Sequence, residues 1–362
     1  MIRVLNIIFI FLLTGCMSNY GIDDLAMLSG VGFDASEDEG KHFDITTMYQ
    51  IPSETDVFEY LHANADSLMN ADIELMSQTK REVVNGQLRI SLFGEQLAKD
   101  GIFPIILSFL RDPSIGPLVY LAVAKGTAKD VLVTQLKKEP NTGSYIQTML
   151  ERLDEEDVYP SVNLLQFARS YYDDGIDPYL PMIFSTKKNI VLEGIALFKD
   201  DRMITSISKE KAIFIFLLSK EFKEGVVDLE IELGGKKENI HLSYVCTKHK
   251  IKVSKENKNN FTVNFELHLT GSLEGYSGDQ TLSKDSVQKE IESKVNTILS
   301  SEMKGMLSFL QKHKVDTIGV GESIRNSLSY EEWKNLNWDE VYPKINFTTD
   351  VTMKIRNMSK FK

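Results

Sequence analysis

Cysteine and tryptophan are scarce in this chain. Its 362 residues include 2 cysteines and 2 tryptophans. Two cysteines cannot build the disulfide framework that stabilises small secreted domains. The chain must therefore bury ordinary hydrophobic cores, and its 42% hydrophobic content allows this. At roughly 100 to 200 residues per domain, the length indicates about two or three domains.

Positive charge is also in deficit. Lys and Arg total 41 against 52 Asp and Glu, which gives a net charge of −11. A chain with this balance has no general attraction for polyanions, so we expect no nucleic-acid partner. The sequence also lacks low-complexity tracts and any repeat of about 20 to 50 residues, which excludes solenoids and long linkers.

The amino terminus has the pattern of a signal peptide. It carries one charge at Arg3, then an apolar run, then Leu13-Thr14-Gly15-Cys16. The run is shorter than the roughly 20 apolar residues that span a bilayer. The last four residues match a lipobox, in which small residues precede a cysteine that receives diacylglycerol. We predict that residues 1–15 are removed and that Cys16 becomes an S-diacylglycerol cysteine whose amino group is open to N-acylation.

Two other interpretations of this segment stay open. It could be a plain cleaved secretory signal, or an uncleaved anchor in which Cys16 has no special role. The acidic body of the protein gains nothing from anionic lipid headgroups, so stable membrane attachment would have to come from the lipid itself. The prediction is therefore a protein attached to a membrane through its lipid anchor.

Residues 16–187 alternate between strand and helix patterns. Apolar runs at 24–33 and 42–51, separated by an acidic turn, predict a hairpin. Helical spacing follows over 56–76. The remaining expected elements are strands at 88–93 and 118–124 and helices at 94–101, 103–110 and 128–136. This half of the chain is thus expected to be a mixed α/β domain.

Residues 188–362 have a different pattern. Apolar and polar residues alternate over 227–233, 261–269 and 345–355, which is typical of half-buried strands in an antiparallel sheet. Residues 285–314 show helical periodicity, and Asp285 with Gln288 resembles a capping box. We predict an α+β domain in which an antiparallel sheet packs on one long amphipathic helix, either as one unit or as two subdomains.

No catalytic motif is present, and three local patterns that suggest chemistry are weak. Gly30-Val-Gly32-Phe-Asp34-Ala35 has the spacing of a dinucleotide fingerprint, but an acidic turn follows where a helix would have to begin. Its glycines are better explained by close packing. Gly275-Tyr-Ser-Gly278 is one residue short of a hydrolase elbow. We predict no catalytic residues and no cofactor.

A metal site is possible in principle at His241, Cys246 and His249. Strand parity puts the two histidines on one face and the cysteine on the other, unless a bulge shifts the register. The shift of apolar parity across this stretch is consistent with such a bulge. We nevertheless predict no metal and interpret Cys246 as a small buried hydrophobe. Residues 236–258 hold seven lysines, which we interpret as a solvated strand face or, less simply, as a docking surface for an acidic partner or lipid headgroups.

Several segments together resemble the Ger(x)C family, the lipoprotein C subunits of spore nutrient germinant receptors. The resemblance extends over nearly the whole mature chain and includes the lipobox cysteine. The matching segments are Ile22–Asp34, Leu92–Ile102, Arg111–Pro113, Leu192–Met203 and, most specifically, Asp316-Thr-Ile-Gly-Val-Gly321 followed by Trp333 and Asn337-Trp338-Asp-Glu340.

The resemblance implies a protein held by diacylglycerol on the outer face of the spore inner membrane. It would act with two integral-membrane receptor subunits, one of which is transporter-like and is thought to hold the germinant. Family members are not enzymes, and only Cys16 carries over as a residue with a defined chemical role. Direct small-molecule binding by this chain is left open. Trp333 and Trp338 could form a contact surface, although packing is the better explanation.

Two functions from other classes remain as alternatives. One is a solute-binding lipoprotein of a transport system, which would need two similar α/β lobes around a cleft. The two halves of this chain differ in pattern. The other is an envelope hydrolase, for which the sequence offers no catalytic set.

Overall fold

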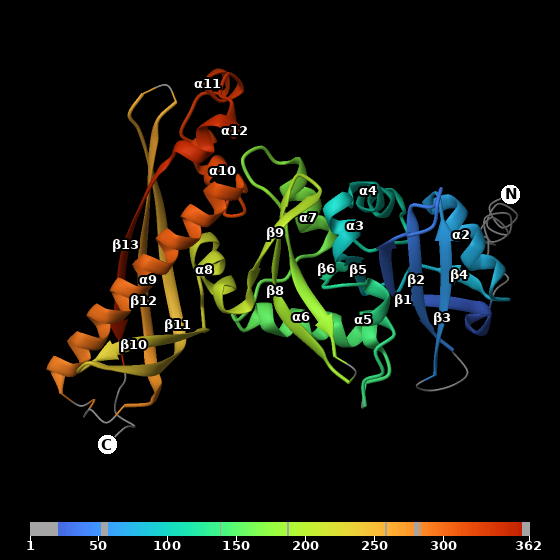
Figure 1. The fold of residues 1–362 in the computed structure, drawn as a ribbon, viewed down its shortest axis with the longest axis horizontal. Helices are drawn as coiled ribbons and strands as arrows, with labels where there is room; N and C mark the ends of the chain where they lie inside the picture. Colours follow the sequence, from blue (N-terminus) through green and yellow to red (C-terminus); the bar gives the residue numbers. More distant parts are fainter. Residues whose placement is uncertain are drawn as a thin grey trace, which may run out of the picture.

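The computed structural model describes residues 21–51, 57–137, 139–186, 188–257, 259–278, 282 and 284–356. The predicted signal peptide (residues 1–15) and Cys16 lie outside these residues. The described part is elongated, with one large sheet at the amino-terminal end and a smaller sheet at the other (Figure 1). The expected combination of an α/β region and an α+β region is confirmed.

The first sheet has nine strands in the order β3-β2-β1-β5-β6-β7-β8-β9, with β4 paired to β1. Its elements are β1 (Leu25–Ala35), β2 (Phe43–Gln50), β3 (Phe58–Ala65), α2 (Leu68–Ser77), β4 (Glu82–Val84), β5 (Ile90–Gly94), α3 (Glu95–Asp100), α4 (Phe103–Arg111), β6 (Tyr120–Ala124), α5 (Ala128–Leu132), α6 (Thr142–Glu155), α7 (Leu164–Tyr172), β7 (Tyr179–Ser185), β8 (Ile190–Lys199) and β9 (Arg202–Ser208), after a short 3-10 turn, η1 (Ile22–Asp24). The central strands β1, β5, β6 and β7 are parallel, and β4 also pairs parallel to β1. The outer strands β2, β3, β8 and β9 pair antiparallel.

Helices cover both faces of this sheet. One face packs on α5 and α6 through a cluster that includes Val131, Leu132 and Ile146. The other face packs on α2, α3, α4 and α7 (Figure 1). The buried central strands read as nearly continuous apolar runs because both of their faces are covered.

The hairpin expected near the amino terminus is confirmed as β1 and β2, which pair antiparallel. The single helix expected over 56–76 is wrong, because its first part is the strand β3 and only α2 is helical. In β3 the odd positions Leu61, Ala63 and Ala65 are buried and the residues between them are more exposed. Pairing with β2 rewards this alternation and overrides the helical spacing.

The first sheet extends past the domain boundary that the sequence suggests between 187 and 188. Strands β8 and β9 follow that point and still pair within the first sheet, which ends at Ser208. The next helix, α8 (Lys209–Ser219), buries Phe214, Phe216 and Leu217 on several sides. A helix that is apolar all round must be covered all round, and α8 contacts both β8 and the long helix of the second part.

The second sheet has four strands in the order β10-β11-β12-β13. Its elements are β10 (Gly225–Leu233), β11 (Lys236–Lys255), β12 (Phe261–Tyr276), α9 (Asp285–His313), α10 (Val320–Arg325), α11 (Tyr330–Lys334), α12 (Trp338–Val341), the 3-10 turn η2 (Tyr342–Lys344) and β13 (Asn346–Ile355). The long amphipathic helix is confirmed as α9, which packs on the sheet.

The expected antiparallel sheet is confirmed for β10, β11 and β12 and is wrong for β13, which pairs parallel to β12. The physical reason is the long connection. Helix α9 carries the chain back along the full sheet, so β13 begins at the same end as β12 (Figure 1). Alternating polarity shows that one face of a strand is buried, but it contains no information about strand direction.

Polar side chains of α9 cover the outer edge of β13. They stand at every fourth position on one side of the helix, and each bonds a group of the strand. The bonds are Gln288 Nε2 to Ile355 O (2.9 Å), Ile355 N to Glu292 Oε1 (2.8 Å), Met353 N to Asn296 Oδ1 (2.6 Å) and Ser300 Oγ to Thr349 Oγ1 (2.7 Å). The expected capping box is therefore wrong, because Gln288 reaches the strand. An edge strand covered in this way is protected from pairing with other chains.

Candidate functional site

Two short loops meet between the two parts of the fold, in addition to the hydrophobic contacts made by α8. One follows α7 and contains Asp173 to Pro178, and the other precedes α10 and contains Asp316 to Gly319. The Asp316 N–H donates to Asp177 Oδ2 at 2.7 Å, and the Asp177 N–H donates to the Asp316 carbonyl at 2.9 Å. We call this contact the joint. Its reciprocal bonds connect residues 139 positions apart in the chain.

Two glycines let the backbones of the joint approach closely. The Glu322 N–H donates to the Gly175 carbonyl at 3.1 Å. A Cβ atom on Gly321 would lie 2.4 Å from the Cα atom of Gly175, where real Cβ atoms do not occur. Gly175 also has a φ of +91°, which favours glycine. The joint therefore requires residues without side chains on both sides.

The Asp316 carboxylate organises the start of α10. It accepts hydrogen bonds from the N–H groups of Gly319 (3.1 Å), Val320 (2.9 Å) and Gly321 (2.7 Å), and its residue is 1% exposed. Burial raises the pKa of Asp316 to about 7, and the negative charge of Asp177 also raises it, against the opposing effect of the three N–H donors.

Ion pairs hold the joint on two sides. Lys199 of β8 contacts Asp177 at 3.3 Å and Asp339 of α12 at 3.2 Å, so one ammonium links three segments. Burial alone would lower the pKa of Lys199, but Asp177 and Asp339 outweigh it and raise the pKa. On the other side, Arg325 donates to Asp173 Oδ1 at 2.5 Å and to the Asp174 carbonyl at 2.7 Å.

The pKa of Asp316 predicts how stability depends on pH. An unfolded aspartate titrates near 4, so between about pH 4 and 7 folding takes up a proton at Asp316. The free energy of unfolding should therefore fall as pH rises through this window and level off above about 7. Asp316→Asn removes this titration. In thermal melts between pH 5 and 7, we expect the melting temperature of wild type to fall relative to that of Asp316→Asn as the pH rises. A melting-temperature difference that does not change with pH would contradict the raised pKa of Asp316.

Two of the three residues considered as metal ligands, His241 and Cys246, bond to separate partners, and the ring Nδ1 of His249 is buried without a hydrogen-bond partner among the residues that the structure describes. His241 Nδ1 pairs with Asp228 Oδ1 at 2.6 Å, and Cys246 is half-buried with its thiol donating to the Lys223 carbonyl at 2.8 Å. The bulge that the parity shift suggested is present, because the register shifts between Ser243 and Cys246. Within the described ranges, no three His, Cys, Asp or Glu side chains gather where they could hold a metal ion.

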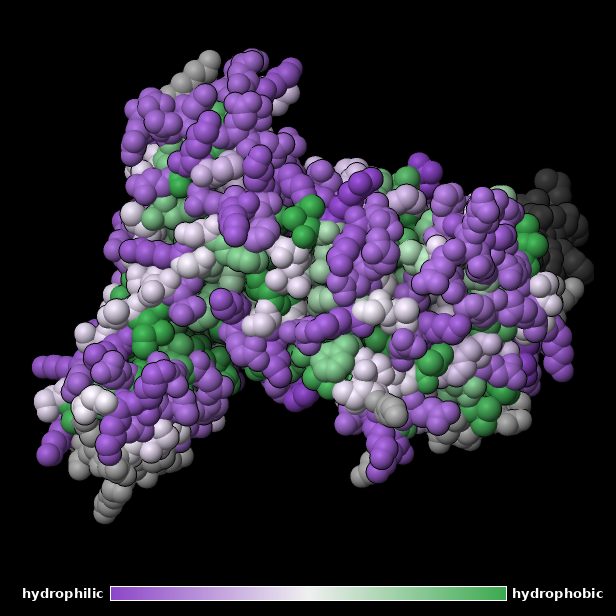
Figure 2. All heavy atoms as spheres, in the orientation of Figure 1, coloured by the Kyte–Doolittle hydropathy of each residue, from purple (hydrophilic) through white to green (hydrophobic). Residues whose placement is uncertain are grey.

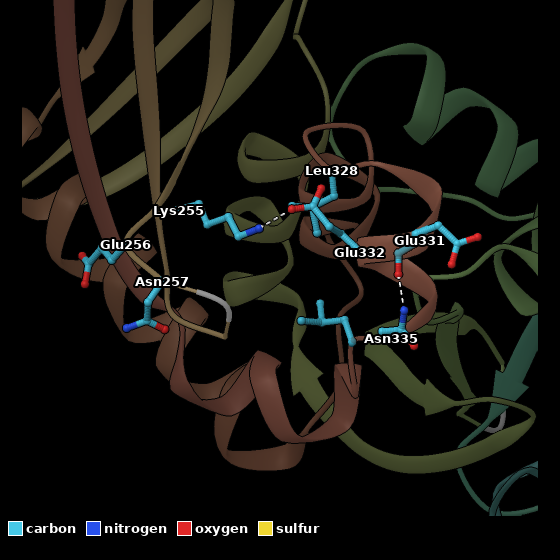
Figure 3. Close-up of a pocket in the computed structure, with 8 residues that line it drawn as sticks. Lys255, Glu256, Asn257, Leu328, Glu331, Glu332 and Asn335 are labelled. Carbon is cyan, nitrogen blue, oxygen red and sulfur yellow. Dashed lines mark hydrogen bonds and ion pairs between the residues drawn. The ribbon is translucent and has the colours of Figure 1, made fainter.

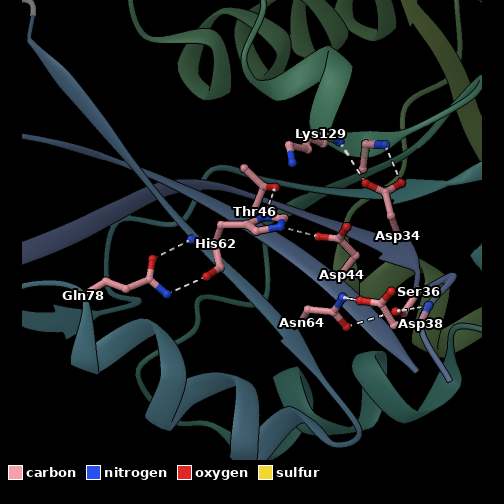
Figure 4. A network of polar contacts seen from close by, with 10 residues as sticks. Asp34, Ser36, Asp38, Asp44, Thr46, His62, Asn64, Gln78 and Lys129 are labelled. Carbon is pink, nitrogen blue, oxygen red and sulfur yellow. Dashed lines mark hydrogen bonds and ion pairs between the residues drawn. The ribbon is translucent and has the colours of Figure 1, made fainter. Parts of the chain in front are cut away.

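The glycines of the first segment serve close packing, as expected. A Cβ atom on Gly30 would lie 2.8 Å from Leu132 Cδ1, and one on Gly32 would lie 3.0 Å from the Cβ atom of Ala128. Asp34 has a role that the sequence analysis missed. Its carboxylate, on strand β1, accepts hydrogen bonds from the N–H groups of Ala128 (2.7 Å) and Lys129 (3.0 Å) and so caps the start of helix α5 (Figure 4).

The two tryptophans pack within the second part of the fold. Trp333 and Trp338 lie 5.5 Å apart between ring centroids, and both are half-buried against the core. The packing explanation is confirmed.

Beside Trp333, Lys255 Nζ reaches Glu332 Oε1 at 2.7 Å and closes one wall of a groove of about 600 Å³ between the β11–β12 tip and α11 (Figure 3).

The lysine-rich stretch of β11 is a solvated strand face over much of its length. Lys248 and Lys250 are exposed, whereas Lys237 and Lys252 form ion pairs with neighbouring strands. Such exposed pairs contribute little to stability. Docking of an acidic partner or of lipid headgroups on this face stays a prediction.

Family comparisons cover almost the whole chain. The family described as "Spore germination protein N-terminal domain" matches residues 20–184, and "Spore germination B3/ GerAC like, C-terminal" matches residues 193–359. The chain belongs to this spore germination family. The resemblance drawn from the sequence is confirmed, and so is a function in spore germination as a germinant-receptor C subunit.

Individual relatives agree with this assignment. The chain is 26% identical to spore germination protein GerQC of Bacillus cereus, with 97% of each chain covered. It is 25% identical to spore germination protein A3 of Bacillus subtilis, with 91% of this chain and 90% of the relative covered. The crystal structure of the GerBC protein has the same fold, with a TM-score of 0.57 and 18% identity over 93% of this chain and 100% of that one.

The joint coincides with the segment that most strongly carries the family resemblance. Asp316 to Gly321 supplies the buried carboxylate, the left-handed Gly319 and the glycine that touches Gly175.

In the part of the chain that the structure describes, no helix is long and apolar enough to cross a bilayer.

Proposed function

We propose that this chain is the lipid-anchored subunit of a spore germinant receptor and that it acts through contacts with integral-membrane receptor subunits. The observation that carries the proposal is the family match over both halves of the chain, together with the lipobox at Cys16. We further propose that it catalyses no reaction and that it lies on the outer face of the spore inner membrane.

The joint supports a mechanical role. A protein without catalytic chemistry can control signalling if it binds one conformation of its partners more tightly than the other, because the difference in contact free energy shifts their equilibrium. Such a subunit must transmit force or position between its surfaces without bending. Reciprocal hydrogen bonds between Asp177 and Asp316, a backbone contact at two glycines and ion pairs through Lys199 and Arg325 give the two parts this rigidity.

Deletion of the gene tests the function. In a strain that lacks other nutrient receptors, we expect spores to form normally and to lose their response to the nutrients that this receptor senses. Germination is measured as the fall in optical density and the release of dipicolinic acid after nutrient addition. A response unchanged from the parent strain would refute the proposal, since no other receptor is present to mask the loss.

Substitution of Cys16 tests the anchor. Each buried methylene contributes about 0.8 kcal/mol, so one acyl chain holds a protein only marginally and two hold it firmly. We expect Cys16→Ala to move the protein from the membrane pellet to the soluble fraction. The matched control is Cys246→Ala, which removes the chain's other cysteine from a half-buried position and should leave membrane association unchanged. Membrane residence of the Cys16 variant after a carbonate wash would contradict a lipid anchor.

A further inference from the structure

Helix α2 carries apolar residues on two opposite sides. The inner side packs on the first sheet through the buried Ala71 and Leu75. The outer side faces solvent and presents three large apolar side chains, which are 75%, 62% and 54% exposed: Met69, Ile73 and Met76. We call these three residues the outer stripe. Their spacing of four and then three residues places them on one helix face, as in helices that lie in an apolar groove of a partner.

The outer stripe is held in a fixed position. Ser67 caps the start of α2 by accepting the N–H of Asn70, and the Gln78 amide at its end bonds both the N–H and the carbonyl of His62 on β3 (Figure 4). The helix is therefore pinned to the sheet edge at one end and capped at the other. A pre-organised surface loses little conformational entropy when a partner binds. The unbranched methionines can adapt to the shape of that partner.

The outer stripe lies at the end of the molecule that the anchor keeps near the membrane. Arg81, which follows α2, donates to the Asp23 carbonyl at 3.2 Å. From Gly21, the first described residue, a fully extended chain reaches Cys16 within about 18 Å. This step rests on the lipid anchor of the proposed function. Figure 2 shows a mostly hydrophilic surface with small hydrophobic patches, some of them at this end.

Charge around the outer stripe distinguishes a protein partner from the bilayer itself. Helix α2 contains Asp72 and Glu74 and no lysine or arginine, and the exposed Asp66 precedes it. Helices that lie on membranes carry lysine and arginine on their polar face, so α2 is poorly suited to anionic headgroups. An apolar groove with cations at its rim would complement both the stripe and the carboxylates.

We propose that the outer stripe of α2 docks into an apolar groove on the outer face of an integral-membrane protein, with lysines or arginines of that protein facing Asp72 and Glu74. The outer stripe is then the surface through which this subunit contacts the membrane-embedded part of its receptor.

In situ photocrosslinking tests the partner. In one strain, benzoylphenylalanine replaces Ile73 in the full-length lipidated chain in spores. In a second strain it replaces Leu165 of α7, an apolar side chain that is 55% exposed. We expect the Ile73 probe to give a crosslink to an integral-membrane protein at least about tenfold stronger than the Leu165 probe. Charge reversal by Asp72→Lys with Glu74→Lys should reduce that crosslink at least about threefold. Crosslinks only to lipid, or only to a second copy of this chain, would overturn the proposal.

Substitution of the outer stripe tests its role. Ile73→Ser with Met76→Ser should slow nutrient germination at least about fivefold, whereas Leu165→Ser should leave the rate unchanged. Both variants must reach wild-type abundance in the membrane fraction, which separates lost docking from lost folding or anchoring. If gene deletion abolishes germination but the stripe variant germinates normally, the receptor assignment stands and this docking surface is wrong.

Discussion

Replacing Gly321 with alanine is expected to weaken the joint strongly. The new Cβ atom would lie 2.4 Å from the Cα atom and 2.7 Å from the carbonyl oxygen of Gly175. Both atoms belong to backbone, so no side chain can rotate away. The loops must move apart, and this stretches the hydrogen bond from the Glu322 N–H to the Gly175 carbonyl and the two hydrogen bonds between Asp316 and Asp177.

We expect Gly321→Ala to lower the free energy of unfolding by about 3 kcal/mol or more, because overpacking and lost buried hydrogen bonds act together. The melting temperature should fall by roughly 5 to 10 °C. Hydrogen exchange should also lose protection at Gly321 and Glu322 before it changes in the strands. This pattern would place the damage in the joint.

Gly305 provides the matched control. It lies on the exposed side of α9, its φ is not positive, and a Cβ atom there would meet nothing within 4 Å. Gly305→Ala should raise helix stability by about 0.5 to 1 kcal/mol, since alanine favours helices. If Gly321→Ala melts at the same temperature as the Gly305 variant, the close backbone contact of the joint is not present in solution.

The sequence contains the parts of the joint but not their pairing. Asp316 to Gly321 stands out through its family resemblance, and Asp173 to Pro178 has the composition of a turn. Nothing in either segment indicates that it meets the other, because each is built from small and acidic residues that occur in most loops. A contact 139 residues apart depends on how both sheets fold. Local patterns carry no information at that range.

Strand and helix patterns were informative where one physical cause acts alone. The periodicity of α9 and of β12 survives because each buries a single face. Prediction failed at β3, where pairing with β2 overrides helical spacing, and at β13, where the connection decides the direction. The bulge near Tyr244 was readable because a change of parity can only arise from an extra residue, and Tyr244 has a φ of +53°.

Replacing Lys199 with methionine is expected to have the second large effect on the free energy of unfolding. Its ammonium is the cation that pairs with Asp177, whose side chain is 7% exposed, and it also reaches Asp339. In Lys199→Met the apolar stem is kept and the charge is lost, so the Asp177 carboxylate stays buried beside Asp316 without its cation, although the Asp316 N–H still donates to it. Breaking a buried ion pair from one side costs about 3 to 5 kcal/mol. Because Lys199 is 30% exposed, we expect a loss of about 2 to 3 kcal/mol in denaturant unfolding.

Two comparisons separate this effect from a general loss of surface charge. Lys125→Met breaks the ion pair between Lys125 and Glu193, in which the two side chains are 52% and 35% exposed. It should lower the free energy of unfolding by about 0.5 kcal/mol or less. Lys199→Met combined with Asp177→Asn should recover part of the loss, because the buried charge is then gone.

The pH dependence of Lys199→Met provides an independent check. Burial raises the pKa of Asp177, and Lys199 opposes this, so removal of Lys199 raises the pKa further. A carboxyl with a raised folded-state pKa destabilises the fold above that pKa and ceases to do so as it is protonated. The stability gap between wild type and Lys199→Met should therefore be largest at neutral pH and narrow as the solution is acidified. A gap that stays constant between pH 5 and 8, or one that the double variant does not narrow, would mean that Asp177 is solvated and that the joint is not held by this charge.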